Sequence, residues 1–251
     1  MPATTSFKDH FSGHADAYAR YRPTYPLELF RFLAAEAPDR GCAWDCATGN
    51  GQVAISLAQF FDRVIATDAS SQQIDQAPGG RNVEFRAAPA EASGLPAASV
   101  ALVTVGQALH WFDLDAFYAE ARRVLKPDGV LAAWSYALAH VNPEVDRVVE
   151  YLIDDLTGPW WPPERKLVDE GYASLPFPFS RIDTPAFDMR TNWNYDQFSN
   201  YLRTWSGVQR YLKDTGRDPV GEVDGNLRSA WGDPDTAQSV TWPLAVRAGR
   251  P

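Results

Sequence analysis

Asp45-Cys46-Ala47-Thr48-Gly49-Asn50-Gly51 lies between an apolar segment and a stretch with helical periodicity. Two glycines separated by one residue let the backbone turn sharply and approach a ligand without an intervening Cβ atom. Asp68 follows 23 residues after Asp45, at the end of the next apolar run. A carboxylate at that position accepts hydrogen bonds from the hydroxyls of a ribose. The two features together predict a binding site for a cofactor that contains adenosine.

The glycine pattern by itself leaves two alternatives open. It also fits the fingerprint of dinucleotide-binding proteins, which accepts alanine at its third small position, here Ala54. A tight turn between a strand and a helix, with no ligand, has the same appearance. The position of Asp45 favours a binding site, because ligands of open α/β sheets bind at the carboxyl ends of the strands.

The composition favours a globular protein that acts on a small molecule. The chain has 251 residues, of which 45% are apolar, so it can bury a full core. Its net charge is -9, and no run of lysine and arginine forms a basic patch. Such a chain repels nucleic acid and anionic membranes. We therefore expect a small-molecule substrate, no nucleic-acid or membrane partner, and a monomer or a homodimer.

The apolar pattern and the cysteines favour a cytoplasmic protein without a metal. The N-terminal residues lack the charged start and following apolar region of a signal peptide, so none is predicted. No apolar run approaches the ~18 residues of a membrane span. Cys42 and Cys46 lie on the same face of a predicted strand, too far apart along it for a disulfide. No cluster has the spacing of metal ligands, so no metal is predicted.

The region 41–134 alternates between short apolar runs and helical patterns, which predicts a parallel sheet with helical crossovers. The run at 100–105 is almost continuously apolar, as expected for a strand covered on both faces. A turn at 126–129 separates the last helix of the series from its last strand. The predicted strands are 42–46, 63–67, 83–86, 100–105 and 130–134. The predicted helices are 52–60, 71–76 and one that begins at Asp113 or Asp115 and ends at Leu125.

The two flanking regions do not alternate in this way. Aromatic and basic residues in 7–25 recur at helical spacing, and a second helix is predicted at 27–37, where Pro38 ends it. Asn142 and the apolar stripe behind it predict another helix. Further helices are predicted at 195–212 and 219–231, and further strands at 187–193 and 237–247.

A series of motifs runs in order along residues 7–135. The motifs are Phe11-Ser12 through Tyr18, Tyr21-Arg22-Pro23-Thr24-Tyr25-Pro26, Asp45-x-Ala47-Thr48-Gly49-x-Gly51, Ala66-Thr67-Asp68, Ala90-Glu91, Gln107-Ala108-Leu109-His110-Trp111-Phe112-Asp113 and Leu125-Lys126-Pro127-Asp128-Gly129. This set resembles the class I S-adenosylmethionine-dependent methyltransferases of type 11, and most of all the trans-aconitate methyltransferase-like branch. The set is specific, because a dehydrogenase would not carry its later members.

The resemblance implies a Rossmann-like α/β fold. Its seven-stranded sheet would be mostly parallel, with a reversed final hairpin supplied by the strands at 187–193 and 237–247. It also implies four regions along the chain. These are N-terminal lid helices in 1–40, a cofactor-binding α/β core in 41–141, an inserted helical and aromatic cap in 142–186, and C-terminal strands and helices in 187–251 that complete core and cap.

The resemblance also implies S-adenosyl-L-methionine as the cofactor and S-adenosyl-L-homocysteine as its product. Gly49 and Gly51 would lie beneath the methionine and ribose parts, with Asp45 near the amino group, whose charge suits a carboxylate. Ala47 stands where the family usually has glycine, which we expect to be harmless if its φ is negative. The other implied cofactor contacts are Thr48, Asp68 at the ribose, Ala90 and Glu91 at the adenine, Gln107, and Tyr18 and Arg22 of the lid.

His110 is the candidate catalytic residue. It follows the fourth predicted strand, and its loop is expected to face the transferable methyl group. An imidazole of near-neutral pKa can take a proton from a hydroxyl or amine nucleophile, whereas a carboxylate nucleophile needs no base. The alternative is a histidine that packs beside Trp111 and orders the loop. Trp111, Trp160 and Trp161 are candidate substrate contacts, and the last two fit a small core of the cap equally well.

Three functions remain open at this point. Methyl transfer from S-adenosyl-L-methionine to a small organic molecule, with a carboxylate or a hydroxyl as acceptor, accords with the whole set of motifs. An NAD(P)-dependent oxidoreductase would share the glycine turn, but not the 40 residues before the first strand or the turn at 126–129. A non-catalytic module that binds a nucleoside cofactor is the third. The sequence does not identify the methyl acceptor.

Overall fold

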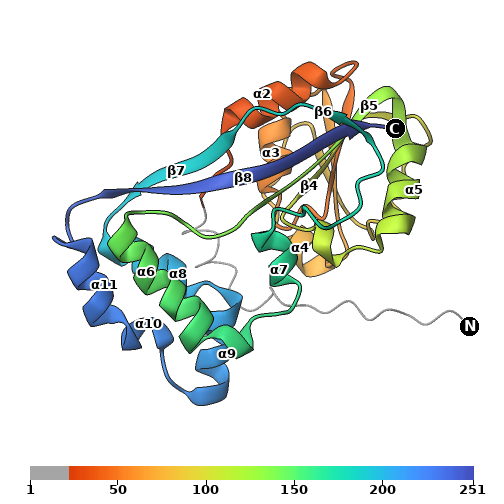
Figure 1. Cartoon of the computed structure of the whole chain (residues 1–251). Helices are drawn as coiled ribbons and strands as arrows, with labels where there is room; N and C mark the ends of the chain where they lie inside the picture. Colours follow the sequence, from red (N-terminus) through yellow and green to blue (C-terminus); the bar gives the residue numbers. More distant parts are fainter. Residues whose placement is uncertain (1–22) are drawn as a thin grey trace, which may run out of the picture.

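The computed structural model describes residues 23–251 (Figure 1). Tyr18, Arg22 and the helix predicted before Pro23 lie outside the described residues. The second predicted helix is confirmed as α2 (Leu27–Glu36). Its inward side chains, among them Phe30, have no exposed surface, so α2 is part of the core.

Five parallel strands form the centre of the sheet, in the order β3-β2-β1-β4-β5. They are β1 (Cys42–Cys46), β2 (Arg63–Asp68), β3 (Val83–Ala87), β4 (Val100–Gly106) and β5 (Leu125–Tyr136). The connecting helices are α3 (Gln52–Leu57), α4 (Ser71–Asp75) and α5 (Leu114–Val124). From β1 the chain adds β2 and β3 on one side of the sheet, and it then adds β4 and β5 on the other side of β1. Such a switch point places a ligand-binding crevice at the carboxyl ends of these two strands.

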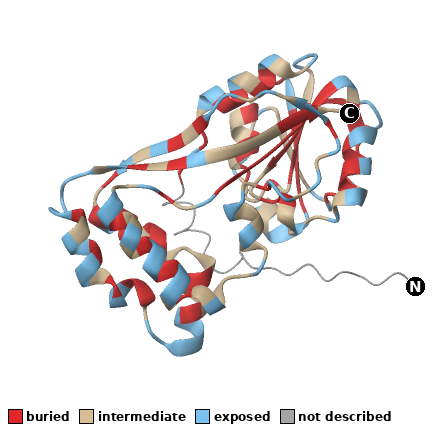
Figure 2. Cartoon of the chain, in the orientation of Figure 1, coloured by how far each residue is buried: buried red, intermediate tan, exposed pale blue. Residues whose placement is uncertain are grey.

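Apolar layers cover both faces of the central strands, which are mostly buried in Figure 2. Successive side chains of a strand point to opposite faces. Ala43 and Leu102 therefore join the layer of α2 and α3, whereas Trp44 and Val103 join the layer of α5. Burial on both faces explains why the strand at 100–105 reads as a continuous apolar run.

The last strand reverses the direction of the sheet. β8 (Gln238–Arg250) pairs antiparallel with β5 on one side, and with β6 (Ser180–Ile182) and β7 (Phe187–Trp193) on the other. Ile182 pairs with Ala248 and Phe187 with Leu244, so between these pairs four residues of the edge segment oppose three of β8. An extra residue of this kind interrupts an edge strand without ending it. β6 and β7 therefore occupy one position, and the seven-stranded fold with a reversed final hairpin is confirmed.

The turn predicted at 126–129 lies inside β5 and not before it. Val100 pairs with Leu125 and Leu102 with Val130, so the ladder between them is irregular. Asp128 has a φ of 62°, which is the turn chemistry that the sequence predicts. The strand extends further back than predicted because Leu125 pairs with β4, a long-range contact that local periodicity does not show.

A helical unit lies at the far end of the long β7–β8 hairpin (Figure 1). Asn142 begins it as predicted, because its side chain accepts the backbone N–H groups of Glu144 and Val145. The elements of the unit are α6 (Pro143–Tyr151), a π-helical turn η2 (Leu152–Leu156), η3 (Gly158–Trp160), α8 (Tyr195–Arg203), α9 (Ser206–Thr215), α10 (Pro219–Glu222) and α11 (Asp224–Trp231).

The single helix predicted at 195–212 is wrong, since the chain forms α8 and α9 there. Trp205 separates them with an extended backbone, at a ψ of 137°. Its ring packs edge-on against Tyr201 and Trp161. These contacts outweigh the helical periodicity that continues across the break. The helix predicted at 219–231 is divided in the same way, at Val223.

The segment 142–186, predicted as an inserted cap, packs in two places. Its first part, α6, contacts α11 in the helical unit. Its later part, from α7 (Arg165–Asp169) onward, returns to β5, and Tyr172 and Phe179 join the α5 layer. The domain boundaries that the resemblance implies stay a prediction.

Candidate active site

The glycine turn joins β1 to α3 at the carboxyl edge of the sheet. Gly49 and Gly51 have φ values of 56° and 91°, in the left-handed region that favours glycine. A Cβ on Gly51 would lie 2.7 Å from the ring of Phe85, so packing also requires glycine there. A Cβ on Gly49 would meet no described atom closer than Oε1 of Gln73, at 4.0 Å. A ligand can therefore approach the backbone closely at Gly49.

Ala47 departs from the backbone conformation that its residue type favours. Its φ is 54°, so the condition under which alanine would be harmless is not met. The left-handed conformation costs an L-residue roughly 1–2 kcal/mol. A hydrogen bond of 2.9 Å from the N–H of Thr48 to the carbonyl of Thr67 ties the next residue to β2. The turn thus contains a strained residue at its predicted ligand-binding face, as functional sites often do.

Asp68 ends β2 and links the glycine turn to α4. Its Oδ2 accepts the backbone N–H of Gly49 at 2.9 Å, and its Oδ1 accepts that of Ser70 at the same distance. Both are charge-assisted hydrogen bonds. The structure therefore brings together Gly49 and Asp68, the two features from which the sequence predicts one ligand site.

Asp45 lies beneath the turn and is only 1% exposed. Its two carboxylate oxygens accept the hydroxyls of Thr48, at 2.5 Å, and of Thr104, at 2.8 Å. Burial raises the pKa of Asp45 to about 7, and the charge of Asp68 adds to the shift, against the two threonine hydrogen bonds. An ammonium group nearby would favour the charged form. A cofactor amino group at this place would thus suit Asp45.

The raised pKa of Asp45 predicts how stability depends on pH. The protonated carboxyl stabilises the folded protein below its unfolded pKa of 3.8, and this contribution is lost as the pH rises through about 7. We expect the unfolding free energy of the wild type to fall between about pH 5 and about pH 8. Its fall should exceed that of Asp45→Asn by on the order of 2 kcal/mol. Urea unfolding at both pH values measures this, and parallel losses in the two proteins would contradict it.

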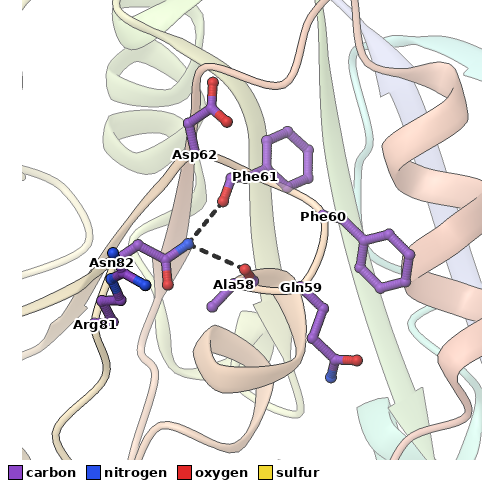
Figure 3. Close-up of a pocket in the computed structure, with 7 residues that line it drawn as sticks. All are labelled: Ala58, Gln59, Phe60, Phe61, Asp62, Arg81 and Asn82. Carbon is purple, nitrogen blue, oxygen red and sulfur yellow. Dashed lines mark hydrogen bonds between the residues drawn. The ribbon is translucent and has the colours of Figure 1, made fainter.

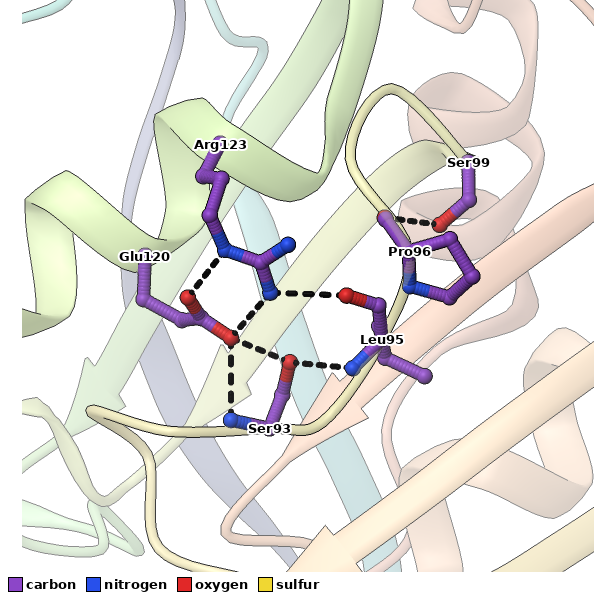
Figure 4. A network of polar contacts seen from close by, with 6 residues as sticks. All are labelled: Ser93, Leu95, Pro96, Ser99, Glu120 and Arg123. Atoms are coloured by element: carbon purple, nitrogen blue, oxygen red, sulfur yellow. Dashed lines mark hydrogen bonds and ion pairs between the residues drawn. The ribbon is translucent and has the colours of Figure 1, made fainter.

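A charged network anchors the loop 88–99 to α5 (Figure 4). Oε1 of Glu120 accepts the backbone N–H of Ser93 at 2.9 Å and its hydroxyl at 2.5 Å. Arg123 pairs with Glu120 at 2.7 Å and donates to the carbonyl of Leu95. The bond with Arg123 lowers the pKa of Glu120 to about 2, so the anchor is charged at neutral pH. The loop that follows β3 is therefore held in a fixed position.

The loop 88–99 carries the two predicted adenine contacts, Ala90 and Glu91. Ala90 is buried in the α5 layer. Oε1 of Glu91 accepts the backbone N–H of Asp113 at 3.1 Å, and Asp113 in turn caps α5. Glu91 thus supports the start of α5, and the contact of both residues with adenine stays a prediction.

Gln107 joins the carboxyl ends of β4 and β5. Its φ is 58°, and its side-chain amide donates to the carbonyl of Tyr136 at 2.9 Å. The amide oxygen Oε1 of Gln107 accepts the backbone N–H of Tyr136 at 3.2 Å. This reciprocal pair is a structural role that the sequence does not indicate. A contact of Gln107 with cofactor or substrate stays a prediction.

His110 lies just beyond Gln107, in the short helix η1 (Leu109–Trp111). Its half-buried ring packs on Trp111, with 4.6 Å between the ring centroids. Its Nδ1 lies 2.9 Å from the hydroxyl of Tyr172. Burial lowers the pKa of His110 to about 4, and the charge of Glu164 only partly opposes this. His110 is therefore neutral at pH 7 and a weak base.

Two residues that contact the candidate site residues are not predicted from the sequence. Tyr172 is fully buried and comes from an irregular segment 62 residues after His110, so no local pattern marks it. Thr104 does have a signal, because it is the one hydroxyl in an otherwise apolar strand. It pairs with Asp45 across the β1–β4 ladder, where its hydroxyl meets the carboxylate.

The three candidate substrate tryptophans lie in two places. Trp111 is 38% exposed and adjoins His110. Trp160 and Trp161 lie in the helical unit, where their indole N–H groups bind Asp214 at 3.1 Å and Thr157 at 3.0 Å. These bonds favour the alternative in which the pair forms a small core of the cap. Substrate contact by any of the three stays a prediction.

The pocket of Figure 3 lies at the opposite edge of the sheet. It has a volume of about 510 Å³ and is lined by residues 58–62 with Arg81 and Asn82. The amide of Asn82 donates to the carbonyls of Ala58 and Phe61, at 3.0 and 2.8 Å. These residues precede β2 and β3, whereas the motif residues follow their strands. The pocket is therefore separate from the candidate active site.

The carboxyl edge suits S-adenosyl-L-methionine. A bound cofactor would find room at Gly49, a carboxylate for its ribose hydroxyls at Asp68, and a carboxylate for its amino group at Asp45. The indole N–H of Trp134, buried opposite Gly106, has no hydrogen-bond partner among residues 23–251. A buried donor without a partner is costly, so this edge offers a further group to an acceptor.

Two other kinds of site find no support in the described part of the chain. Within residues 23–251, no three or more side chains of His, Cys, Asp and Glu are placed to hold a metal ion. Over the same range, no helix combines the length and the apolar character that crossing a membrane requires.

Comparison with known proteins identifies the family. A family model described as "Methyltransferase domain", of type 11, matches residues 44–133, from β1 to β5. A Dictyostelium discoideum protein named "Putative methyltransferase" is 32% identical over 235 residues, which cover 92% of this chain and 89% of that protein. A Saccharomyces cerevisiae protein named "Probable S-adenosylmethionine-dependent methyltransferase" is 30% identical over 154 residues, or 57% of this chain and 50% of that protein.

A solved structure gives the same result. A "Putative Type II Methyltransferase" from Anaeromyxobacter dehalogenans superposes with a TM-score of 0.87 at 49% identity, covering 92% of this chain and 98% of that one. These matches decide against the NAD(P)-dependent oxidoreductase and the non-catalytic module. With a relative above 30% identity along nearly the whole chain, the protein belongs to the type 11 family of class I S-adenosylmethionine-dependent methyltransferases.

Proposed function

We propose that the protein methylates a carboxylate oxygen of a small organic molecule. The cofactor supplies an electrophilic methyl group when bound, and the residues of this chain bind and orient the acceptor. The observation that carries the proposal is the environment of His110, whose Nδ1 contacts a phenol and not a carboxylate. A histidine base is usually oriented by a carboxylate and has a pKa near the working pH. His110 has neither property.

A carboxylate acceptor needs no base. It is ionised at neutral pH and attacks the methyl carbon directly, whereas a hydroxyl must lose its proton. Asp45, whose pKa is raised to about 7, is buried beneath the glycine turn and bound to two threonines. In-line orientation of the acceptor then supplies much of the rate. The net charge of -9 supports a small substrate over nucleic acid.

A screen of small molecules tests the proposal. Carboxylic acids, phenols, alcohols and amines are each incubated with the protein and cofactor that carries a radioactive methyl group. Methyl esters of carboxylic acids release the label as methanol in mild alkali, whereas ethers and methylamines keep it. Label that stays with the product after alkali would contradict a carboxylate acceptor. The variant Gly49→Val, which we expect not to bind the cofactor, serves as the control.

His110→Asn should leave the rate of methyl transfer nearly intact. We expect kcat to fall by less than about tenfold and KM for the acceptor to rise, because His110 positions the acceptor and removes no proton. Loss of a general base would instead lower kcat roughly 10²–10⁴-fold. The profile of kcat/KM against pH is the decisive measurement. An ionisation near 6.5, the ordinary pKa of histidine, that disappears in His110→Asn would contradict the proposal.

The finer predictions belong to this proposal. The resemblance to the trans-aconitate methyltransferase-like branch accords with a carboxylate acceptor, and it rests on the motifs alone. A cytoplasmic location and a monomeric or homodimeric state are likewise predictions from the sequence. A hydroxyl acceptor remains the second candidate, since it is the other oxygen nucleophile that the motifs permit.

A further inference from the structure

The buried Tyr172 and the half-buried His110 form a pair between the sheet edge and the chain that follows α7. The hydroxyl of Tyr172 lies 2.9 Å from Nδ1 of His110, with 5.7 Å between the ring centroids. Tyr172 has no exposed surface. A fully buried phenol needs a hydrogen-bond partner for its hydroxyl, and His110 provides one.

β8 fixes the backbone that carries the phenol. Tyr172 has a φ of 61° and follows Gly171, whose φ is 58°. Arg247 of β8 donates to the carbonyls of Tyr172 and Leu175, at 2.5 and 2.9 Å. A Cβ on Gly171 would lie 2.6 Å from Cβ of Ala245, which is also on β8. The unusual backbone conformation at Tyr172 is thus imposed by contacts with the sheet, as at functional sites that store strain.

The neighbours of the phenol oxygen set the direction of its hydrogen bond. The backbone N–H of Leu109 acts on this oxygen as a donor would, because it opposes the rise in the pKa of Tyr172. Leu109 begins η1, where the first N–H groups of a helix lack helical partners. The phenol proton is then free to point at Nδ1 of His110. In a neutral imidazole whose Nδ1 accepts, the ring proton resides on Nε2.

We infer that Tyr172 is a positioning residue that holds His110 as the neutral Nε2–H tautomer, so that His110 offers the methyl acceptor a hydrogen-bond donor and not a base. The inference rests on the proposed function only for the identity of the acceptor group that would receive the hydrogen bond from Nε2–H of His110. Nδ1 is engaged by Tyr172 and the ring packs on Trp111. Nε2, which makes no hydrogen bond among residues 23–251, is the polar atom left to contact a ligand. An N–H donor suits a carboxylate oxygen.

The charges around the pair are consistent with a neutral imidazole. Glu164 acts on His110, and Tyr25 and Tyr136 act on Tyr172. Burial dominates in both cases, since it lowers the pKa of His110 and raises that of Tyr172. Neither group changes its charge between about pH 6 and about pH 8. The tautomer should therefore be the same across this range.

NMR spectroscopy of the full chain with ¹⁵N-labelled histidine tests the inference, with S-adenosyl-L-homocysteine as the probe ligand. Long-range proton–nitrogen correlations distinguish the two neutral tautomers from each other and from the charged ring. His110→Asn assigns the signal, and the exposed His140 is an internal reference. We expect His110 to be the Nε2–H tautomer, without titration between about pH 6 and about pH 8.

Two matched variants separate the hydroxyl from the packing of the ring. Tyr172→Phe should convert the single tautomer of His110 into a mixture. Tyr118→Phe removes a phenol hydroxyl that binds the carbonyl of Pro176 at 2.7 Å, in the same apolar layer, and should leave the His110 signals unchanged.

Three outcomes would overturn the inference: an Nδ1–H tautomer in the wild type, a charged ring at pH 7, or equal changes in both variants. The wild-type tautomer is decisive by itself if Tyr172→Phe does not fold. The measurement needs no methyl transfer, so a failed acceptor screen beside a confirmed tautomer would refute the proposed function alone.

Discussion

Gly49→Val should abolish detectable binding of S-adenosyl-L-homocysteine while the protein still folds. A branched side chain resists the φ of 56° and projects toward the space that the cofactor is expected to occupy. We expect the affinity to fall by roughly two orders of magnitude or more, which corresponds to about 2.7 kcal/mol. Titration calorimetry measures the affinity, and circular dichroism with thermal unfolding measures the fold.

Gly216→Val is the matched control for this experiment. Gly216 ends α9 with a φ of 72°, and a Cβ there would meet no described atom within 4 Å. The control therefore carries a similar backbone strain in the helical unit. We expect it to lower the melting temperature without changing the affinity. Equal affinity in Gly49→Val and the wild type would show that the glycine turn has a structural role only.

Asp68→Ala should weaken the binding of S-adenosyl-L-homocysteine about 30–150-fold, or on the order of 2–3 kcal/mol. The variant loses the carboxylate predicted to hold the ribose hydroxyls. It also loses the acceptors of the N–H groups of Gly49 and Ser70, so the glycine turn and α4 are no longer tied together. Asp68→Asn keeps one acceptor oxygen and should show an intermediate loss. Titration calorimetry again gives the affinities.

Asp233→Ala is the control for Asp68→Ala. Asp233 also accepts a backbone N–H, from Asp235 at 3.1 Å, but it lies in the turn between α11 and β8. Its removal should leave the affinity unchanged. If Asp68→Ala binds as tightly as this control, Asp68 is no part of the cofactor site.

The sequence alone predicts the α/β core because its signals are local. Alternating apolar runs and turn residues predict the five central strands along the chain, and the continuous run at 100–105 indicates burial on both faces. The glycine turn and Asp68 are also local signals, each at the end of a strand. They meet in space because parallel strands end at the same edge of a sheet. The predicted proximity of Gly49 and Asp68 is accordingly confirmed by the hydrogen bond between them.

The tertiary structure alone decides the features that depend on distant contacts. Trp205 divides one predicted helix because its ring meets Trp161. Ala47 adopts a positive φ within a turn tied to β2, which the residue type by itself would not suggest.

The state of His110 is decided in the same way. Its neighbour Tyr172 comes from a segment 62 residues away that β8 holds in place. Burial, which packing sets, lowers the pKa of the imidazole from its ordinary value of 6.5 to about 4 and so makes it a weak base. The sequence therefore determined where the cofactor site is predicted to lie, and the packing of distant segments decided the protonation of His110.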